Sequence, residues 1–143
     1  MNFLSLYKRF FIYLLKRKKN IDKDYFSRKD FEELFSYYGS DKASNWKNIK
    51  NSGHGYSKFY QNKLIKFKDL PIKILEIGSY SGASAASFAK FFPNSKIYCL
   101  DINISNFKYK SNQINVFGID VANEKSKNKF LKLIENESNE PFF

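Results

Sequence analysis

The stretch of residues 71–101 most constrains the fold of this chain. Residues 72–77 form a short β-branched run, bounded by a proline and a glycine, that predicts a buried strand. Residues 83–92 are rich in alanine and predict a closely packed helix, and residues 96–100 predict a second strand that ends at Asp101. A strand, a helix and a strand in this order predict parallel strand pairing, with the helix on one face of the sheet.

The same alternation continues towards the end of the chain. Residues 114–119 predict a third strand that ends at Asp120, and residues 123–137 predict a helix. That helix would turn three apolar side chains inward, Phe130, Leu131 and Ile134. We therefore predict an α/β fold with a Rossmann-like parallel sheet. Residues 141–143 resemble the start of a fourth strand, so we expect a sheet that is truncated after about three strands.

Composition divides the chain into three regions. Residues 1–20 combine apolar residues with a basic end and predict an amphipathic helix, too short and interrupted for a membrane span. Residues 21–70 predict a helical cap, with helices over 31–38 and 56–67. The second of these helices would carry four apolar residues on one side, Phe59, Tyr60, Leu64 and Phe67. Residues 71–143 predict the partial Rossmann-like domain.

The charge of the chain is strongly positive, with 25 basic and 14 acidic residues in 143 and a formal net charge of +11. Nearly all of the basic residues are lysines, whereas arginine is the usual bidentate ligand of phosphate and guanine. We therefore do not expect a nucleic-acid partner, and RNA methylation is a disfavoured alternative. Residues 1–20 would either contact an anionic membrane surface or pack on the domain or a second subunit, as in a homo-oligomer.

The single cysteine and the single histidine exclude two kinds of site. One cysteine excludes an intramolecular disulfide framework and a cysteine-based zinc site, and one histidine excludes a multi-histidine metal centre. Cys99 lies within a predicted apolar strand, so we interpret it as a small buried residue. His54 lies in a glycine-flanked loop, where we favour a structural or cofactor-adjacent role over that of a base.

A glycine-containing turn joins the first predicted strand to the alanine-rich helix. Gly78 lets the chain turn off the strand, and Gly82 lets the helix begin close to the strand and to a ligand. The helix N-terminus offers free N–H groups. Asp101, at the end of the next strand, lies where a carboxylate binds the two hydroxyls of a ribose.

The turn does not fit a dinucleotide or a nucleoside triphosphate. Tyr80 stands where the dinucleotide fingerprint needs its second glycine, and its side chain would obstruct a pyrophosphate, which disfavours an NAD-dependent enzyme. No Gly-Lys-Ser/Thr sequence follows, so the turn is not a Walker A loop. A nucleoside ligand without a diphosphate, such as S-adenosylmethionine (SAM), suits this turn.

Two groups of residues resemble methyltransferase motifs. Residues 75–84 and 92–102 resemble motif I and the following acidic strand of class I SAM-dependent methyltransferases. Residues 39–42, Gly-Ser-Asp-Lys, and 54–60 resemble elements of the macrocin-type and sugar O-methyltransferase branch of antibiotic and surface-glycan pathways. The resemblance covers about residues 37–135, which is the N-terminal half of such an enzyme.

The resemblance implies roles for individual residues. Glu76 would hydrogen-bond around the methionine amino group, Asp101 would hold the ribose hydroxyls, and Asp120 would lie near the adenine. Lys42 and Tyr56 would close over the cofactor from the N-terminal side. The full cofactor-binding set that it implies is Glu76, Gly78, Ser79, Tyr80, Gly82, Ser84, Asp101, Ile102, Asp120, Lys42 and Tyr56.

The function implied by the resemblance is that of the SAM-binding portion of an O-methyltransferase that acts on a sugar, glycan or natural-product hydroxyl. It implies a bacterial, cytoplasmic protein, with residues 1–20 at the inner membrane face as one possibility. No catalytic residue and no metal ligand is assigned, because in intact relatives the base and the Mg²⁺ ligands follow the point at which this sequence ends. The alternative is a catalytically inactive fragment that binds a membrane or a protein partner through its basic N-terminal helix.

Overall fold

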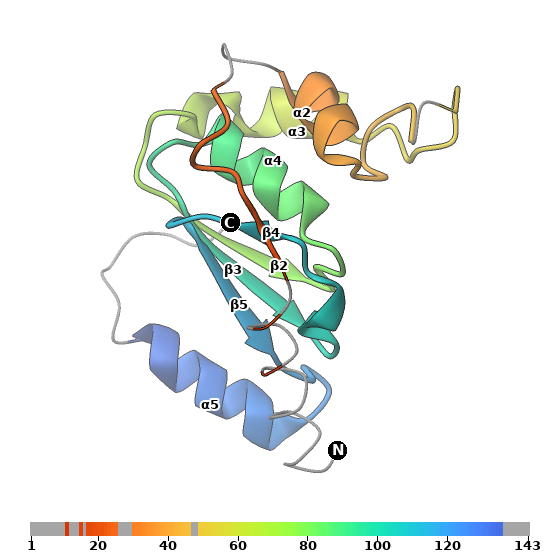
Figure 1. Ribbon diagram of the computed structural model, residues 1–143. Helices are drawn as coiled ribbons and strands as arrows, with labels where there is room; N and C mark the ends of the chain where they lie inside the picture. The colour runs from red at the N-terminus through yellow and green to blue at the C-terminus, as the bar shows by residue number, and fades with distance from the viewer. Residues whose placement is uncertain (1–10, 12–14, 16, 26–29, 47–48, 136–143) are drawn as a thin grey trace.

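The computed structural model describes residues 11, 15, 17–25, 30–46 and 49–135. Figure 1 shows a sheet with helices on both faces. The elements in chain order are β1 (Lys19–Asn20), α2 (Phe31–Tyr38), α3 (Ser57–Leu64), the 3-10 helix η1 (Ile65–Phe67), β2 (Lys73–Ile77), α4 (Ala83–Phe91), β3 (Lys96–Asp101), the 3-10 helix η2 (Ile104–Asn106), β4 (Tyr109–Lys110), β5 (Ile114–Gly118) and α5 (Glu124–Glu135).

The main sheet has three strands in the order β2-β3-β5, and both pairs are parallel. The register aligns Ile77 with Leu100 and Asp101 with Gly118, so the carboxyl ends of all three strands lie at one edge (Figure 1). The predicted strand-helix-strand unit and its parallel pairing are confirmed. The reason is that β-branched runs of strand length are separated by a helix that is long enough to cross back over the sheet.

One face of the sheet is covered by α4, and α2 and α3 lie above it (Figure 1). Small residues on α4 let the helix pack closely on the strands, and its phenylalanines meet those of α2. Phe31 of α2 stacks on Phe91 with ring centroids 4.0 Å apart, and Phe88 meets Phe35 edge-on at 5.8 Å. This aromatic cluster joins the helical cap to the Rossmann-like sheet in one core.

The opposite face is covered by α5, which contributes a smaller cluster. Phe130 and Ile134 are buried there against Tyr98 and Leu100 of β3, as their spacing predicts. The expectation that Leu131 also faces inward is wrong, because 40% of its surface is exposed. One helical step from Phe130 turns Leu131 by about 100° and carries it off the buried stripe.

The first cap helix, α2, has the bounds 31–38 that the sequence predicts. Asp30 caps α2 by accepting a hydrogen bond from the Glu33 amide at 2.8 Å, and Gly39 ends the helix with a φ of 76°. The second cap helix is divided into α3 and η1. Of the four apolar residues expected on one side of this helix, Phe59 does not share the buried side, because 61% of its surface is exposed. Tyr60, Leu64 and Phe67 do pack against the core.

The N-terminal region differs from the sequence prediction at its end. Lys19 and Asn20, expected as the end of a helix over residues 1–20, form β1 and pair in parallel with β4. The backbone amides and carbonyls of β1 and β4 are satisfied by hydrogen bonds between the two strands. These segments lie far apart in the sequence, so no local pattern predicts the pairing. The rest of that helix lies mostly outside the described residues, and so does the strand lead-in at 141–143. Among the described residues, no helix is long and apolar enough to span a bilayer.

Candidate functional site

Several of the predicted site residues lie where the strands end. The Gly78 amide donates to the carbonyl of Leu100 at 2.8 Å, and the Ile119 amide donates to the carbonyl of Asp101 at 3.0 Å. These two bonds fix the chain just beyond the ends of three neighbouring strands. Asp101 therefore ends β3 and Asp120 follows the adjacent β5, at the same edge of the sheet, where ligands bind in open α/β folds.

The turn between β2 and α4 has three residues with positive φ. They are Gly78 at 79°, Tyr80 at 44° and Gly82 at 74°. A Cβ on Gly78 would meet nothing within 4 Å, so the backbone conformation alone explains this glycine. A Cβ on Gly82 would lie 2.3 Å from the Phe107 ring. The close approach that we predicted at Gly82 therefore includes a buried phenylalanine that sequence reasoning did not identify.

Asp101 is held by backbone donors at both carboxylate oxygens. Its Oδ2 accepts from the Tyr80 amide at 2.7 Å, and its Oδ1 accepts from the Asn103 amide at 2.8 Å. The carboxylate is thus oriented by the same turn that carries Gly78. The Tyr80 side chain is 66% exposed and that of Ile102 is 47% exposed, so both lie at the surface beside Asp101.

The Glu76 carboxylate is confined, with its side chain 10% exposed. Its Oε1 accepts from the Lys42 ammonium at 3.3 Å and from the Ser84 hydroxyl. Its Oε2 is buried and has no hydrogen-bond partner, the one such side-chain atom among the described residues. A buried carboxylate oxygen without a donor is costly, so this atom is one donor short. The Ser79 hydroxyl donates to the backbone carbonyl of Glu76 at 3.1 Å and stiffens the start of the turn.

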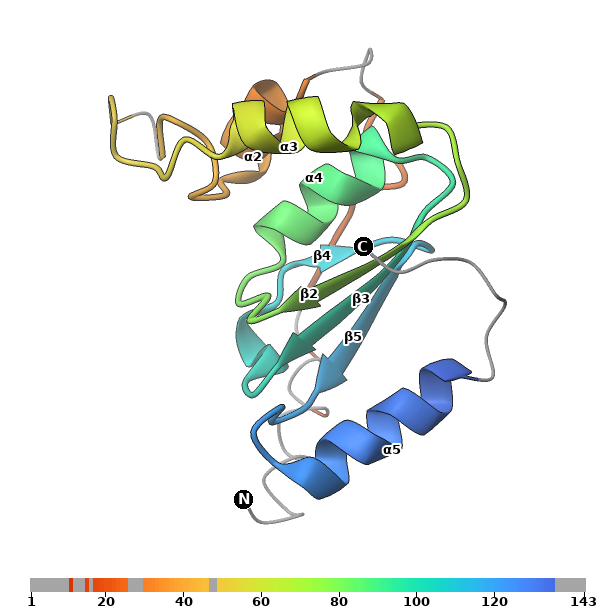
Figure 2. The ribbon, with the colours of Figure 1, turned by 180° about the vertical axis from the view of Figure 1, so that it is seen from behind.

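Lys42 reaches Glu76 from the loop between α2 and α3. This loop lies on the same side of the molecule as the strand tips (Figure 2). Its two halves are held together by backbone hydrogen bonds, among them Tyr56 amide to Lys42 carbonyl at 2.9 Å and Gly55 amide to Ala43 carbonyl at 3.1 Å. The Lys42 ammonium also donates to Ser84 at 3.1 Å, so it bridges the cap, β2 and α4.

Tyr56 and His54 lie together on the outer part of this loop. Their rings stack with centroids 5.3 Å apart, and Tyr56 is 49% exposed. The Nε2 atom of His54 lies 3.4 Å from Oδ2 of Asp41. The structure thus brings Lys42 into contact with Glu76, while the Tyr56 side chain contacts His54 and not the Glu76 carboxylate.

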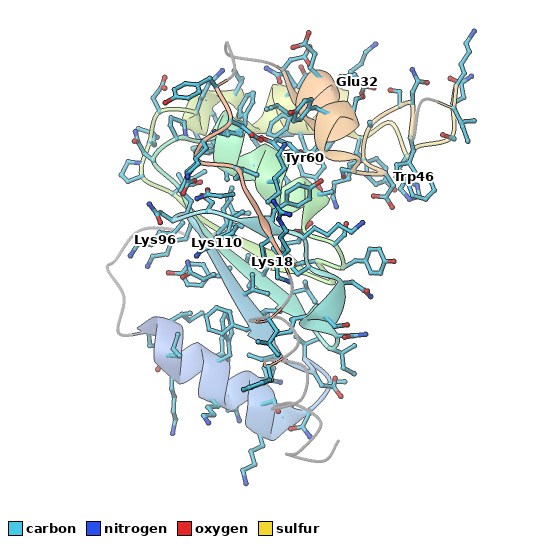
Figure 3. The ribbon with its side chains drawn as sticks, in the orientation of Figure 1. Lys18, Glu32, Trp46, Tyr60, Lys96 and Lys110 are labelled. Atoms are coloured by element: carbon cyan, nitrogen blue, oxygen red, sulfur yellow. The ribbon has the colours of Figure 1, made fainter. Side chains whose placement is uncertain are left out.

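Tyr60 is a neighbour of the ion pair that was absent from the predicted set. Figure 3 shows it extending from α3 towards α4. Burial raises the pKa of the Tyr60 hydroxyl, while the Lys42 charge lowers it and the Glu76 charge raises it. Tyr60 therefore senses both charges. Its helical spacing indicated an apolar side and gave no sign that its hydroxyl lies near these charges.

Asp120 and Cys99 have identifiable structural contacts. The Oδ1 of Asp120 accepts from the Ala122 amide at 3.0 Å, and its carbonyl accepts from the Asn123 amide at 3.1 Å, so the residue shapes the turn into α5. Cys99 is buried, as predicted, and burial together with the nearby Glu76 charge raises the pKa of its thiol. Among the described residues, no three His, Cys, Asp or Glu side chains cluster as metal ligands.

Comparison with solved structures finds proteins with a similar fold. The chain is similar to MycE methyltransferase from the mycinamycin biosynthetic pathway, in complex with Mg, SAH and mycinamycin VI, with a TM-score of 0.58 and 20% identity over 74% of this chain. Two crystal forms of MycE with Mg and SAH give TM-scores of 0.58 and 0.59, with 21% and 20% identity over 75% of this chain.

This chain has a methyltransferase-like Rossmann fold. The likeness confirms the predicted fold class, and it spans 27–29% of the length of the MycE chains. No protein-family model and no curated protein matches the sequence. At this level of identity the comparison establishes the fold, and the site residues are argued from their own geometry.

Proposed function

We propose that this chain is the SAM-binding portion of an O-methyltransferase that acts on a sugar or another natural-product hydroxyl. The observation that carries the proposal is the Glu76 carboxylate, which is confined at the end of β2 with one oxygen short of a donor. An ammonium group is a strong donor to such an oxygen, and the methionine end of SAM carries one. The group therefore fits the residues that are present.

Asp101 supports the same ligand at the neighbouring strand. Each of its oxygens accepts one backbone hydrogen bond. A carboxylate has about four acceptor sites, so two remain for the hydroxyls of a ribose. Because β2 and β3 are adjacent and parallel, Glu76 and Asp101 present an ammonium site and a diol site at one edge of the sheet. An adenosine that carries an amino-acid chain has both groups.

The turn itself supports a ligand without a diphosphate. The amide of Tyr80 donates to Asp101, which removes from the turn one N–H group that a phosphate would need. When bound, SAM supplies a methyl group on a sulfonium, which an acceptor oxygen attacks in line. This chain would orient the cofactor by its amino and ribose groups, and proximity would supply much of the rate. The MycE structures contain SAH, and one of them contains the macrolide mycinamycin VI, which supports a small-molecule acceptor.

The test is calorimetric titration of the full chain with S-adenosylhomocysteine, the product that retains the amino and ribose groups. We expect binding in the wild type, and a loss of about tenfold or more in Glu76→Gln and in Asp101→Asn. Glu33→Gln is the matched control, because it removes the same charge from an exposed position on α2. Failure of the folded wild type to bind S-adenosylhomocysteine, or tighter binding of NADH, would overturn the proposal.

A further inference from the structure

We propose that residues 18–24 are a positioning segment for the turn between β2 and α4. They hold residues 107–111 in place, and residues 107 and 108 in turn support the backbone of that turn. The inference rests on the proposed function to the extent that this turn binds the ligand. It adds a role for the N-terminal part of the chain, in which sequence reasoning placed no site residue.

The first step is the contact between the turn and residues 107–108. The Lys108 amide donates to the carbonyl of Ser81 at 3.0 Å. The Phe107 ring is buried and lies so close to Gly82 that a Cβ on this glycine would be 2.3 Å from it. Two consecutive residues of the turn therefore rest on two consecutive residues of the chain just before β4. A displacement of Phe107 would leave a void beneath Gly82, which a close-packed interior disfavours.

The second step is the backbone pairing that holds residues 107–111. β4 pairs with β1 and not with the three-stranded sheet. The Lys19 amide donates to the carbonyl of Lys108 at 2.9 Å, and the Ile21 amide donates to the carbonyl of Lys110 at 3.0 Å. The strand hydrogen bonds of β4 thus come from the N-terminal segment, which is distant in sequence from the turn that it supports.

Two charged side chains of residues 18–24 reinforce this pairing at its ends. The Lys18 ammonium, labelled in Figure 3, donates to the carbonyl of Phe107, the residue beneath the turn. The Asp22 carboxylate accepts from the Ser111 hydroxyl at 2.6 Å and from the Asn112 amide at 2.9 Å. Hydrogen bonds with one charged partner are stronger than neutral ones. Residues 107–112 are therefore fixed on both sides of β4.

The other end of the segment is anchored to the cap and to α4. The Asp24 carboxylate pairs with the Lys19 ammonium at 2.8 Å and accepts from the Tyr38 hydroxyl at 3.3 Å, and its backbone carbonyl accepts from Lys90 at 2.8 Å. The Ile21 side chain is fully buried in the main core. Figure 1 shows the segment running from the level of the cap helices to β4. It therefore connects the rigid core with the support of the turn.

Asp101 is tied to the same support. Its carboxylate accepts from the amides of Tyr80 in the turn and Asn103 before η2, and the chain then leads through η2 to Phe107. The turn and Asp101 are thus positioned together. If residues 18–24 release Phe107, the ligand must order these groups when it binds, and that ordering lowers its affinity.

The first measurement is amide hydrogen exchange of the full chain, followed by NMR. In Lys18→Met we expect exchange about tenfold faster at the amides of Lys108 and Gly82, because local opening of the turn becomes easier. The Ile97 amide, which donates within the main sheet, is the internal reference. Its rate should change by about twofold or less, because opening of the turn leaves the main sheet closed.

Two further variants separate the contact from the charge. Lys18→Arg keeps a donor for the Phe107 carbonyl, so we expect it to restore rates close to those of the wild type. Lys23→Met is the matched control, since it removes the same charge from an exposed position of the same segment and should leave all rates unchanged. Asp22→Ala is a second test at an exposed position, and we expect several-fold faster exchange at the Asn112 and Lys108 amides.

The second measurement is calorimetric titration with S-adenosylhomocysteine. We expect Lys18→Met to bind it about threefold to tenfold more weakly than the wild type, because the ligand must then order the turn. Lys18→Arg and Lys23→Met should bind it as the wild type does. Far-ultraviolet circular dichroism checks that each variant is folded.

The possible failures are distinguishable. If the folded wild type does not bind S-adenosylhomocysteine, the proposed function is wrong, and the exchange rates alone decide whether residues 18–24 position the turn. If the wild type binds and Lys18→Met binds equally well, the positioning role is overturned. Unchanged exchange at Lys108 and Gly82 overturns it too, and so does equal acceleration at Ile97, since the segment would then stabilise the whole fold alike. Asp22→Ala decides the question if Lys18→Met does not fold.

Discussion

One face of the sheet carries α4 with the cap helices above it, whereas in the described part of the chain the other face carries α5 (Figure 1). The first face has a continuous aromatic core that includes α2 and α4. The second has a cluster of four buried residues, Tyr98, Leu100, Phe130 and Ile134. The face that holds the cap also holds Lys42 beside Glu76, so the larger core positions the candidate site.

This difference shows that the cap helices share one hydrophobic core with the Rossmann-like sheet. Phe31 touches phenylalanines of its own helix and of α4, and Tyr60 of α3 packs against the same rings. Lys42 is therefore carried by a loop whose two flanking helices belong to this core. α5 makes no comparable contribution to the Lys42–Glu76 pair.

The largest expected effect comes from removing one aromatic ring from each face of the sheet. We expect Phe31→Ala to lower the free energy of unfolding by about 4–5 kcal/mol, because it leaves a cavity among several rings. We expect Phe130→Ala to cost about 2–3 kcal/mol, since α5 can settle on a smaller cluster. Urea unfolding followed by circular dichroism measures both. Equal losses of unfolding free energy would show that the two faces contribute equally to stability.

A sharper comparison concerns the two glycines of the turn. Gly82→Ala combines a positive φ with a clash against the buried Phe107 ring, so we expect it to cost about 2–4 kcal/mol. Gly78→Ala has the same backbone penalty but no neighbour within 4 Å, so we expect about 1–2 kcal/mol. Thermal unfolding ranks the two variants. A larger loss at Gly78 would contradict the packing of Phe107 under the turn.

The smallest expected effects come from one carboxylate on each face. For Glu32 of α2, burial raises the pKa, but hydrogen bonds from Ser57 and Ser44 outweigh it and hold the pKa below its usual value. The folded-state pKa is depressed, so this contribution to stability is present above the ordinary pKa of about 4.5 and is lost as the pH falls through the lower value. We expect wild type to lose more stability than Glu32→Gln between about pH 5 and 3.

Glu124 of α5 provides the contrast. Its pKa is lowered by a hydrogen bond and the charge of Lys127, and it is fully exposed. Salt screens an exposed pair of this kind, so we expect the difference between wild type and Glu124→Gln to disappear in 1 M NaCl, where the Debye length is about 3 Å. The stability difference between wild type and Glu32→Gln should persist in 1 M NaCl. Urea unfolding across pH at two salt concentrations separates the two, and loss of both effects in salt would contradict the role of the serine donors.

The sequence by itself determined the strand-turn-helix-strand unit and the edge at which the site lies. β-branched runs, an alanine-rich helix and a glycine turn act through local backbone geometry, so their pattern is present in a short stretch of chain. The placement of Gly78 and Asp101 at one edge of the sheet follows from that unit, because the carboxyl ends of parallel strands must meet there. The resemblance to methyltransferase motifs pointed to the same fold, which the comparison with solved structures confirms.

Only the tertiary structure decided which distant residues meet. Lys42 and Glu76 are 34 positions apart, and Gly82 and Phe107 flank different helices, so no local pattern pairs them. Lys19 was expected in a helix but joins β4, because a strand partner supplied from residues 109–110 outweighs a short helical preference. Helical spacing likewise placed Phe59 on one apolar side of its helix and Leu131 on the inward side. Which side of a helix is buried depends on the surface that covers it, and only packing between segments far apart in the sequence defines that surface.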